Sequence, residues 1–141
     1  MHLKHLGLIV VGTVAAVVIS RSGGSIENPP AELQASKTLV YFSSENCKPC
    51  QKFEASQELQ LQSEIEGLGV RYRKFTTPRY EDLRNKNIFG EFTSTFRAAT
   101  DSTRKVVVPT FAYVENGKLI DARTDELKEL MVKIASRVEA K

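Results

Sequence analysis

Two cysteines, Cys47 and Cys50, are the only ones in this 141-residue chain, and they stand three positions apart in the stretch SSENCKPCQKF. The two histidines, His2 and His5, lie close to the N-terminus. A structural zinc ion needs about four ligands, but His2 and His5 belong to the N-terminal apolar segment and not to the part of the chain that carries the cysteines. A copper site calls for histidine or methionine near the thiols, and none is visible there. A structural disulfide here would close a very short loop and stabilise the fold little. The pair therefore favours thiol redox chemistry over a structural disulfide or a metal site, and we assign no metal ligand.

The residues around the cysteines predict a strand followed by a helix. Lys37–Ser44 (KTLVYFSS) is rich in β-branched and aromatic residues, as strands are. The next stretch is rich in Gln, Glu and Leu and stops at Gly67, as a helix would. Cys47 would then stand at the N-terminus of this helix, where unpaired backbone amides lower the pKa of a thiol. Such a position favours the thiolate, which is the form that attacks disulfides.

The remaining elements follow from the same patterns. Residues 70–77 predict a strand, and residues 105–114 and 118–123 predict two strands joined by an Asn116-Gly117 hairpin turn. Residues 78–104 are too many for a plain loop, so we expect a helix there, centred on Glu91–Ala99. The chain should end in a helix capped by Thr124, with one apolar face made by Leu127, Leu130, Met131, Ile134 and Val138.

This order of elements resembles the thioredoxin-like family of CxxC thiol-disulfide oxidoreductases. The most specific matching residues are Cys47-Lys48-Pro49-Cys50, then Val108-Pro109-Thr110, then YVENGKLI at 113–120. The resemblance covers roughly residues 32–141. It implies an α/β fold with a central mixed β-sheet flanked by helices, preceded here by an N-terminal hydrophobic segment.

The resemblance also implies a role for each matching residue. Cys47 would be the attacking thiol and Cys50 the resolving thiol, so the cofactor would be none beyond the redox-active disulfide Cys47–Cys50. Pro49 would preorganise the first helical turn. Pro109 would follow a cis peptide bond and face the cysteines, and the backbone of Val108 would pair with an extended substrate.

Two residues depart from the pattern of thioredoxins in ways that affect redox tuning. Tyr41 stands where thioredoxins carry a buried acid, so that strand supplies no carboxylate to deprotonate Cys50, and Glu45 is the nearby alternative base. Lys48 replaces a small glycine and adds a cation beside Cys47. Both changes favour the reduced, anionic state, so we expect a potential less reducing than that of typical thioredoxins.

The N-terminus indicates the compartment. Leu6–Ile19 carries no charge and lies between Lys4 and Arg21, which is the arrangement of a secretory signal or a short membrane anchor. We therefore expect a signal peptide or membrane anchor at 1–22, a Gly-, Ser- and Pro-rich linker at 23–36 and a thioredoxin-like domain at 37–141. The domain would be extracytoplasmic, either periplasmic or secreted, and anchored in the membrane by residues 6–19 if these are not cleaved.

Composition and charge restrict the partners. Once Lys4 and Arg21 are set aside, 18 basic side chains face 17 acidic ones, which is not the signature of a nucleic-acid-binding protein. The expected partners are cysteine-containing protein substrates, an unknown thiol-disulfide electron partner, and the membrane through an uncleaved N-terminal segment. The alternative is a non-catalytic thioredoxin-fold adaptor or scaffold in an envelope assembly.

Overall fold

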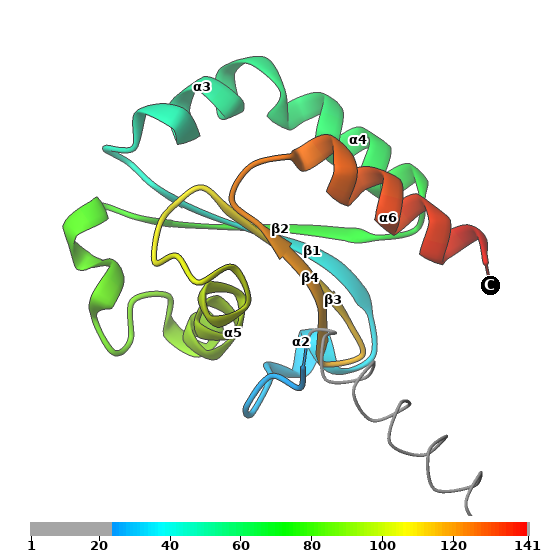
Figure 1. Ribbon diagram of the computed structural model, residues 1–141, viewed down its shortest axis with the longest axis horizontal. Helices are drawn as coiled ribbons and strands as arrows, with labels where there is room; N and C mark the ends of the chain where they lie inside the picture. Colours follow the sequence, from blue (N-terminus) through cyan, green and yellow to red (C-terminus); the bar gives the residue numbers. More distant parts are fainter. Residues whose placement is uncertain (1–23, 141) are drawn as a thin grey trace, which may run out of the picture.

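The computed structural model describes residues 24–140, so the apolar segment Leu6–Ile19 lies outside the described residues. Figure 1 shows a single sheet with helices on both sides. In chain order the elements are α2 (Ala31–Gln34), β1 (Lys37–Ser44), α3 (Lys48–Ser56), α4 (Glu58–Gly67), β2 (Arg71–Thr77), the 3-10 turns η1 (Tyr80–Arg84) and η2 (Gly90–Phe92), α5 (Thr93–Thr103), β3 (Thr110–Glu115), β4 (Lys118–Arg123) and α6 (Leu127–Glu139).

The sheet is mixed, and its strand order is β2-β1-β3-β4. β1 pairs in parallel with β2 and antiparallel with β3, which in turn pairs antiparallel with β4. A parallel pair needs a long crossover connection, and α3 and α4 supply it between β1 and β2. Because β1 lies inside the sheet and both faces are covered, every residue from Thr38 to Ser44 is buried.

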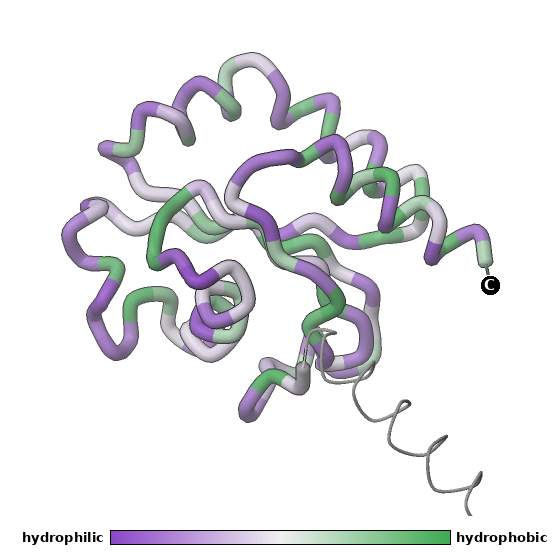
Figure 2. Tube along the Cα trace, viewed as in Figure 1, coloured by the Kyte–Doolittle hydropathy of each residue, from purple (hydrophilic) through white to green (hydrophobic). Residues whose placement is uncertain are grey.

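Each face of the sheet has its own hydrophobic core. In Figure 1, α3, α4 and α6 lie over one face and α5 lies over the other. Figure 2 shows hydrophobic residues recurring between hydrophilic ones along α6, as expected for a helix with one buried face. The core on the α6 side contains Leu39, Tyr41, Phe53, Leu61, Ile65, Phe111, Tyr113, Leu130 and Ile134. The core on the α5 side contains Val40, Phe42, Phe89, Phe96, Ala99, Ala112, Val114 and both cysteines.

Most of the predicted elements are confirmed, with differences at their ends. The strand Lys37–Ser44 is observed as predicted, and Asn116 and Gly117 adopt the positive φ angles of 51° and 80° that a tight hairpin turn requires. The single helix expected up to Gly67 is divided into α3 and α4, because Gln57 leaves the helical region with φ −130°. The strand expected over residues 105–114 begins only at Thr110, after Pro109.

The C-terminal helix begins later than expected. Glu126 occupies the N-cap position with φ 54°, and no side chain caps the helix, so the expected cap at Thr124 is wrong. The left-handed backbone at Glu126 starts the helix at Leu127 instead. The predicted apolar face is confirmed, since Leu130 and Ile134 are buried and Leu127, Met131 and Val138 pack beside them.

Part of the expected linker packs against the domain. Ile26 is 3% exposed and Leu33 is fully buried, and both belong to the core on the α5 side. The amide of Gly117 donates to the Leu33 carbonyl at 2.7 Å, and Ser25 pairs with Lys118 at the edge of β4. Two apolar side chains from this polar stretch therefore complete the core on the α5 side. Within residues 24–140, no helix is both long enough and apolar enough to cross a membrane.

Candidate functional site

The two cysteines lie at the start of α3 and form a disulfide. Cys47 is the N-cap residue, and its sulfur accepts a hydrogen bond of 3.1 Å from the backbone amide of Cys50. Pro49 occupies the first turn, where a missing amide proton costs no helical hydrogen bond. Cys47 is 4% exposed and Cys50 is fully buried, so Cys47 is the more accessible sulfur. Lys48 is exposed, so solvent screens its charge.

The loop before β3 lies against the disulfide. The Val108–Pro109 peptide bond is cis, and the carbonyl oxygen of Val108 lies 3.5 Å from the Cys47 sulfur. Val108 is 5% exposed, whereas Pro109 is half-buried. Residues 61 positions apart in the sequence therefore meet at one end of the sheet, as the resemblance implied.

Tyr41 is buried in the core on the α6 side. Its ring stacks on Phe111 at 4.9 Å between centroids and meets the edge of Phe53 at 5.0 Å. Its hydroxyl donates a hydrogen bond of 2.9 Å to Oε2 of Glu54 on α3, and the Ser43 hydroxyl donates to the same oxygen at 2.8 Å. Burial is the largest cause that raises the pKa of Tyr41 above its ordinary value, and Glu54 adds to the rise. The phenol therefore stays protonated and keeps donating.

Glu54 is a residue that the sequence analysis missed. We expected no buried acid from the strand that carries Tyr41, and none is there, but α3 places a carboxylate against Tyr41 from four residues beyond Cys50. The available signal was the spacing, since residues four apart lie on the same side of a helix. Glu45, the alternative base, is exposed in the loop before Cys47.

The Glu54 carboxylate belongs to a chain of charged and phenolic groups beneath α3 and α4. Lys74 on β2 lies 3.6 Å from Oε1 of Glu54 and 3.2 Å from Oε1 of Glu58. Tyr72 donates a hydrogen bond of 2.9 Å to the other oxygen of Glu58. One ammonium group therefore faces two carboxylates, and each carboxylate also accepts a bond from a tyrosine.

The segment between β2 and α5, residues 78–92, is an insertion that is joined to the loop that carries Cys47. Oδ1 of Asn46 accepts the backbone amide of Tyr80 at 2.8 Å, and its Nδ2 donates to Glu81 at 3.3 Å. The pKa of the Glu81 carboxyl lies below its ordinary value, first because of its own backbone amide and then because of Asn46. Tyr80 is 39% exposed. The insertion is therefore a neighbour of the cysteine loop, which residue patterns did not indicate.

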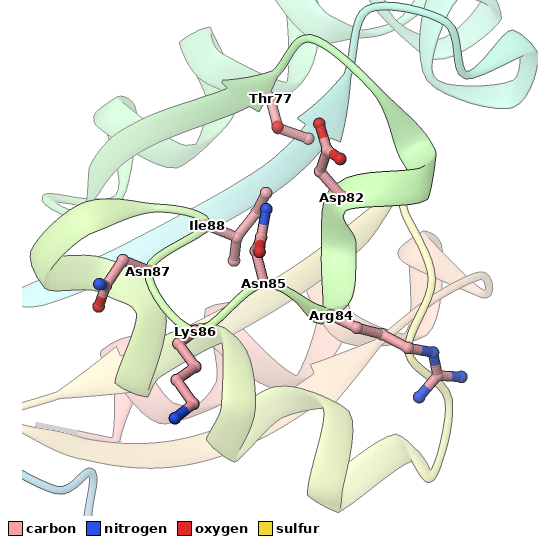
Figure 3. Close-up of a pocket in the computed structure, with 7 residues that line it drawn as sticks. All are labelled: Thr77, Asp82, Arg84, Asn85, Lys86, Asn87 and Ile88. Atoms are coloured by element: carbon pink, nitrogen blue, oxygen red, sulfur yellow. The ribbon is translucent and has the colours of Figure 1, made fainter.

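A shallow hollow opens within this insertion. Its lining residues are Thr77, Asp82, Arg84, Asn85, Lys86, Asn87 and Ile88. Figure 3 shows the Arg84 and Lys86 side chains pointing away from the other residues, whereas Asp82, Asn85 and Ile88 lie near Thr77. Among residues 24–140, no three His, Cys, Asp or Glu side chains gather closely enough to hold a metal ion.

Solved structures with a similar fold carry thioredoxin names. A thioredoxin from Trypanosoma brucei brucei is 17% identical, with a TM-score of 0.52, over 77% of this chain and 80% of that one. The thioredoxin domain of a thiol-disulfide oxidoreductase from Bacteroides vulgatus is 15% identical, with a TM-score of 0.53, over 83% of this chain and 97% of that one. No family model and no curated protein sequence matches the chain. The chain therefore has a thioredoxin-like α/β fold with a Cys47–Cys50 disulfide at the start of a helix.

Proposed function

We propose that this chain is an extracytoplasmic thiol-disulfide oxidoreductase that exchanges disulfides with cysteine-containing proteins through Cys47-Lys48-Pro49-Cys50. The observation that carries the proposal is the position of the pair. The disulfide lies at the N-terminus of α3, with the Val108 carbonyl 3.5 Å from the more accessible sulfur. A helix N-terminus stabilises a thiolate, and an extended substrate beside Val108 would bring its own sulfur to Cys47.

The proposed exchange has two steps. In the reduced protein, the Cys47 thiolate attacks one sulfur of a substrate disulfide, and the other substrate sulfur leaves with the bonding electrons as a thiolate. The Cys50 thiol then loses its proton and attacks the Cys47 sulfur, and the second substrate sulfur leaves as a thiolate. The substrate gains two electrons, the protein returns to the Cys47–Cys50 disulfide, and the reverse sequence oxidises a substrate dithiol.

The test uses the purified chain with a disulfide-containing protein and a dithiol reductant. We expect the wild type to accelerate reduction of the protein disulfide, Cys47→Ser to abolish the acceleration, and Cys50→Ser to accumulate a mixed disulfide on Cys47. Because the chain has no third cysteine, no other thiol of the chain can replace Cys47. A wild type that exchanges with neither protein disulfides nor glutathione would contradict the proposal and favour a non-catalytic adaptor.

A further inference from the structure

We infer that Glu54 holds a negative charge beside Cys50 and thereby sets how tightly the Cys50 thiol retains its proton. This role rests on the proposed function, in which Cys50 must lose that proton to resolve the mixed disulfide. The feature that carries it is the hydrogen-bonded group made by Tyr41, Ser43 and Glu54.

The first step of the argument is position. Cys50 and Glu54 both lie on α3, and residues four apart on a helix have their Cβ atoms about 5–6 Å apart on the same side. Glu54 points toward β1 and not into solvent, because Tyr41 and Ser43 of that strand both donate to its Oε2. Tyr41 and Ser43 are themselves fully buried. The carboxylate is therefore fixed one helical turn from a fully buried sulfur.

The second step is charge. The Glu54 side chain is 27% exposed, so solvent screens it only partly. Lys74 is closer to Glu58, at 3.2 Å, than to Glu54, at 3.6 Å, so one cation is shared between two anions. Glu54 is linked through hydrogen bonds and ion pairs to Tyr41 on β1, to Lys74 and Tyr72 on β2 and to Glu58 on α4. The charged groups around the cysteine loop are Glu45, Lys48 and Glu81. The group formed by Glu54, Glu58 and Lys74 carries a net charge of about minus one, which opposes a thiolate at Cys50.

This arrangement makes the two thiols differ in how readily they lose a proton. Cys47 at the helix N-cap receives the amide of Cys50 on its sulfur, which favours its thiolate. Cys50 is fully buried, and the fixed carboxylate lies one turn further along the same helix, and both conditions favour its protonated form. In the reduced protein the attacking thiol is thus the easier of the two to ionise, and the resolving thiol holds its proton more tightly. In this inference, Glu54 on α3 supplies the opposing negative charge that β1 lacks at Tyr41.

The test measures the proton affinity of Cys50 directly. In a Cys47→Ser chain, Cys50 is the only thiol, so the carbon-13 chemical shift of its Cβ against pH reports its pKa without interference from the four tyrosines. We expect a second change, Glu54→Gln, to lower the pKa of Cys50 by about one unit, as loss of a unit charge at roughly one helical turn implies. The matched control is Glu58→Gln, which removes a carboxylate that binds the same lysine and another tyrosine but lies in α4, and it should shift the pKa several-fold less.

A further variant, Lys74→Met, keeps the test decisive if Glu54→Gln does not fold. Lys74→Met removes the shared cation and should move the pKa of Cys50 upward, opposite to Glu54→Gln. Equal shifts for Glu54→Gln and Glu58→Gln, or no shift in folded Glu54→Gln, would overturn the inference. If Glu54→Gln does not fold, a Lys74→Met shift that is absent or downward would overturn it. The titration needs no substrate, so its failure is distinguishable from a failure of disulfide exchange in the wild type.

Discussion

The Asn46 side chain joins the loop before Cys47 to the backbone of Tyr80, through a hydrogen bond of 2.8 Å to Oδ1. Asn46 is also the residue immediately before the attacking cysteine in the proposed mechanism. The Asn46 side chain therefore links the insertion to the cysteine loop, and a change at Asn46 should loosen this link before it affects the core.

Replacing Asn46 tests this link. Asn46→Ala removes the acceptor for the Tyr80 amide and the donor to Glu81, and a hydrogen bond contributes about 1 kcal/mol. We expect amide hydrogen exchange at Tyr80 to accelerate about fivefold, since about 1.4 kcal/mol corresponds to a factor of ten. Asn46→Asp is the control, because its carboxylate still accepts from Tyr80. Unchanged exchange at Tyr80 in the alanine variant would show that other contacts hold the insertion.

The Glu81 carboxyl should respond to acid at an unusually low pH. Its pKa is lowered from 4.5, first by its own backbone amide and then by the Asn46 amide. A lowered pKa means that the hydrogen-bonded carboxylate contributes to folding stability above pH 4.5. This contribution is lost as the pH falls through the lowered pKa. The side-chain amide resonances of Asn46 should therefore titrate with a midpoint below 4.5. A midpoint at or above 4.5 would contradict the hydrogen bond to Glu81.

Three tyrosines should resist ionisation in alkali. The pKa values of Tyr41, Tyr72 and Tyr113 are raised above 10.0, chiefly because burial disfavours the phenolate. The folded chain thus holds these protons more tightly than the unfolded chain. The stability that the three tyrosines contribute is therefore fully present below pH 10.0 and is lost as the pH rises through their raised pKa values. Ultraviolet titration should show these phenolates forming only with unfolding. Ionisation of all four tyrosines near pH 10.0 in a folded chain would contradict this burial.

Arg137 should stabilise the attachment of α6 to the sheet. Glu115 on β3 is 5% exposed and accepts hydrogen bonds from Arg137 at 2.8 and 3.1 Å and from Tyr113 at 2.7 Å. Arg137→Met removes two hydrogen bonds from a buried carboxylate. Because the arginine side chain is 39% exposed, solvent partly screens the pair, and we expect the free energy of unfolding to fall by about 1–3 kcal/mol.

Denaturant unfolding of the two forms would measure this loss. The control is Arg79→Met, since Arg79 is 66% exposed and its ion pairs with Glu81 and Asp82 are long. That change should alter the free energy of unfolding by less than about 0.5 kcal/mol. Equal effects of the two substitutions would mean that the Glu115 contact contributes no more than a surface ion pair.

Export of the chain is a prediction from Leu6–Ile19 with its flanking Lys4 and Arg21. A reporter that works only in the cytoplasm, fused after Lys141, should be inactive, and replacing two apolar residues of the segment by arginine should restore its activity. Full activity with the native segment would contradict the extracytoplasmic location and leave the redox proposal untouched.

The sequence was sufficient where neighbouring residues decide the structure. Lys37–Ser44 forms a strand because its own residues are β-branched or aromatic, and Asn116-Gly117 turns because both residues accept positive φ. The apolar face of α6 follows from the spacing of its residues, which is a property of the helix itself. The location of Cys47 at the start of α3 likewise needed only the change in composition around it.

The tertiary structure decided which polar partners meet. Tyr41 and Glu54 are 13 positions apart, Asn46 and Tyr80 are 34 apart, and neither pair follows from periodicity. Periodicity indicates which side of an element is apolar, but a hydrogen bond also needs two groups brought within about 3 Å by the packing of separate elements. Ile26 shows the same limit, because one apolar residue in a polar stretch forms no pattern, and its burial depends on core residues that other elements supply.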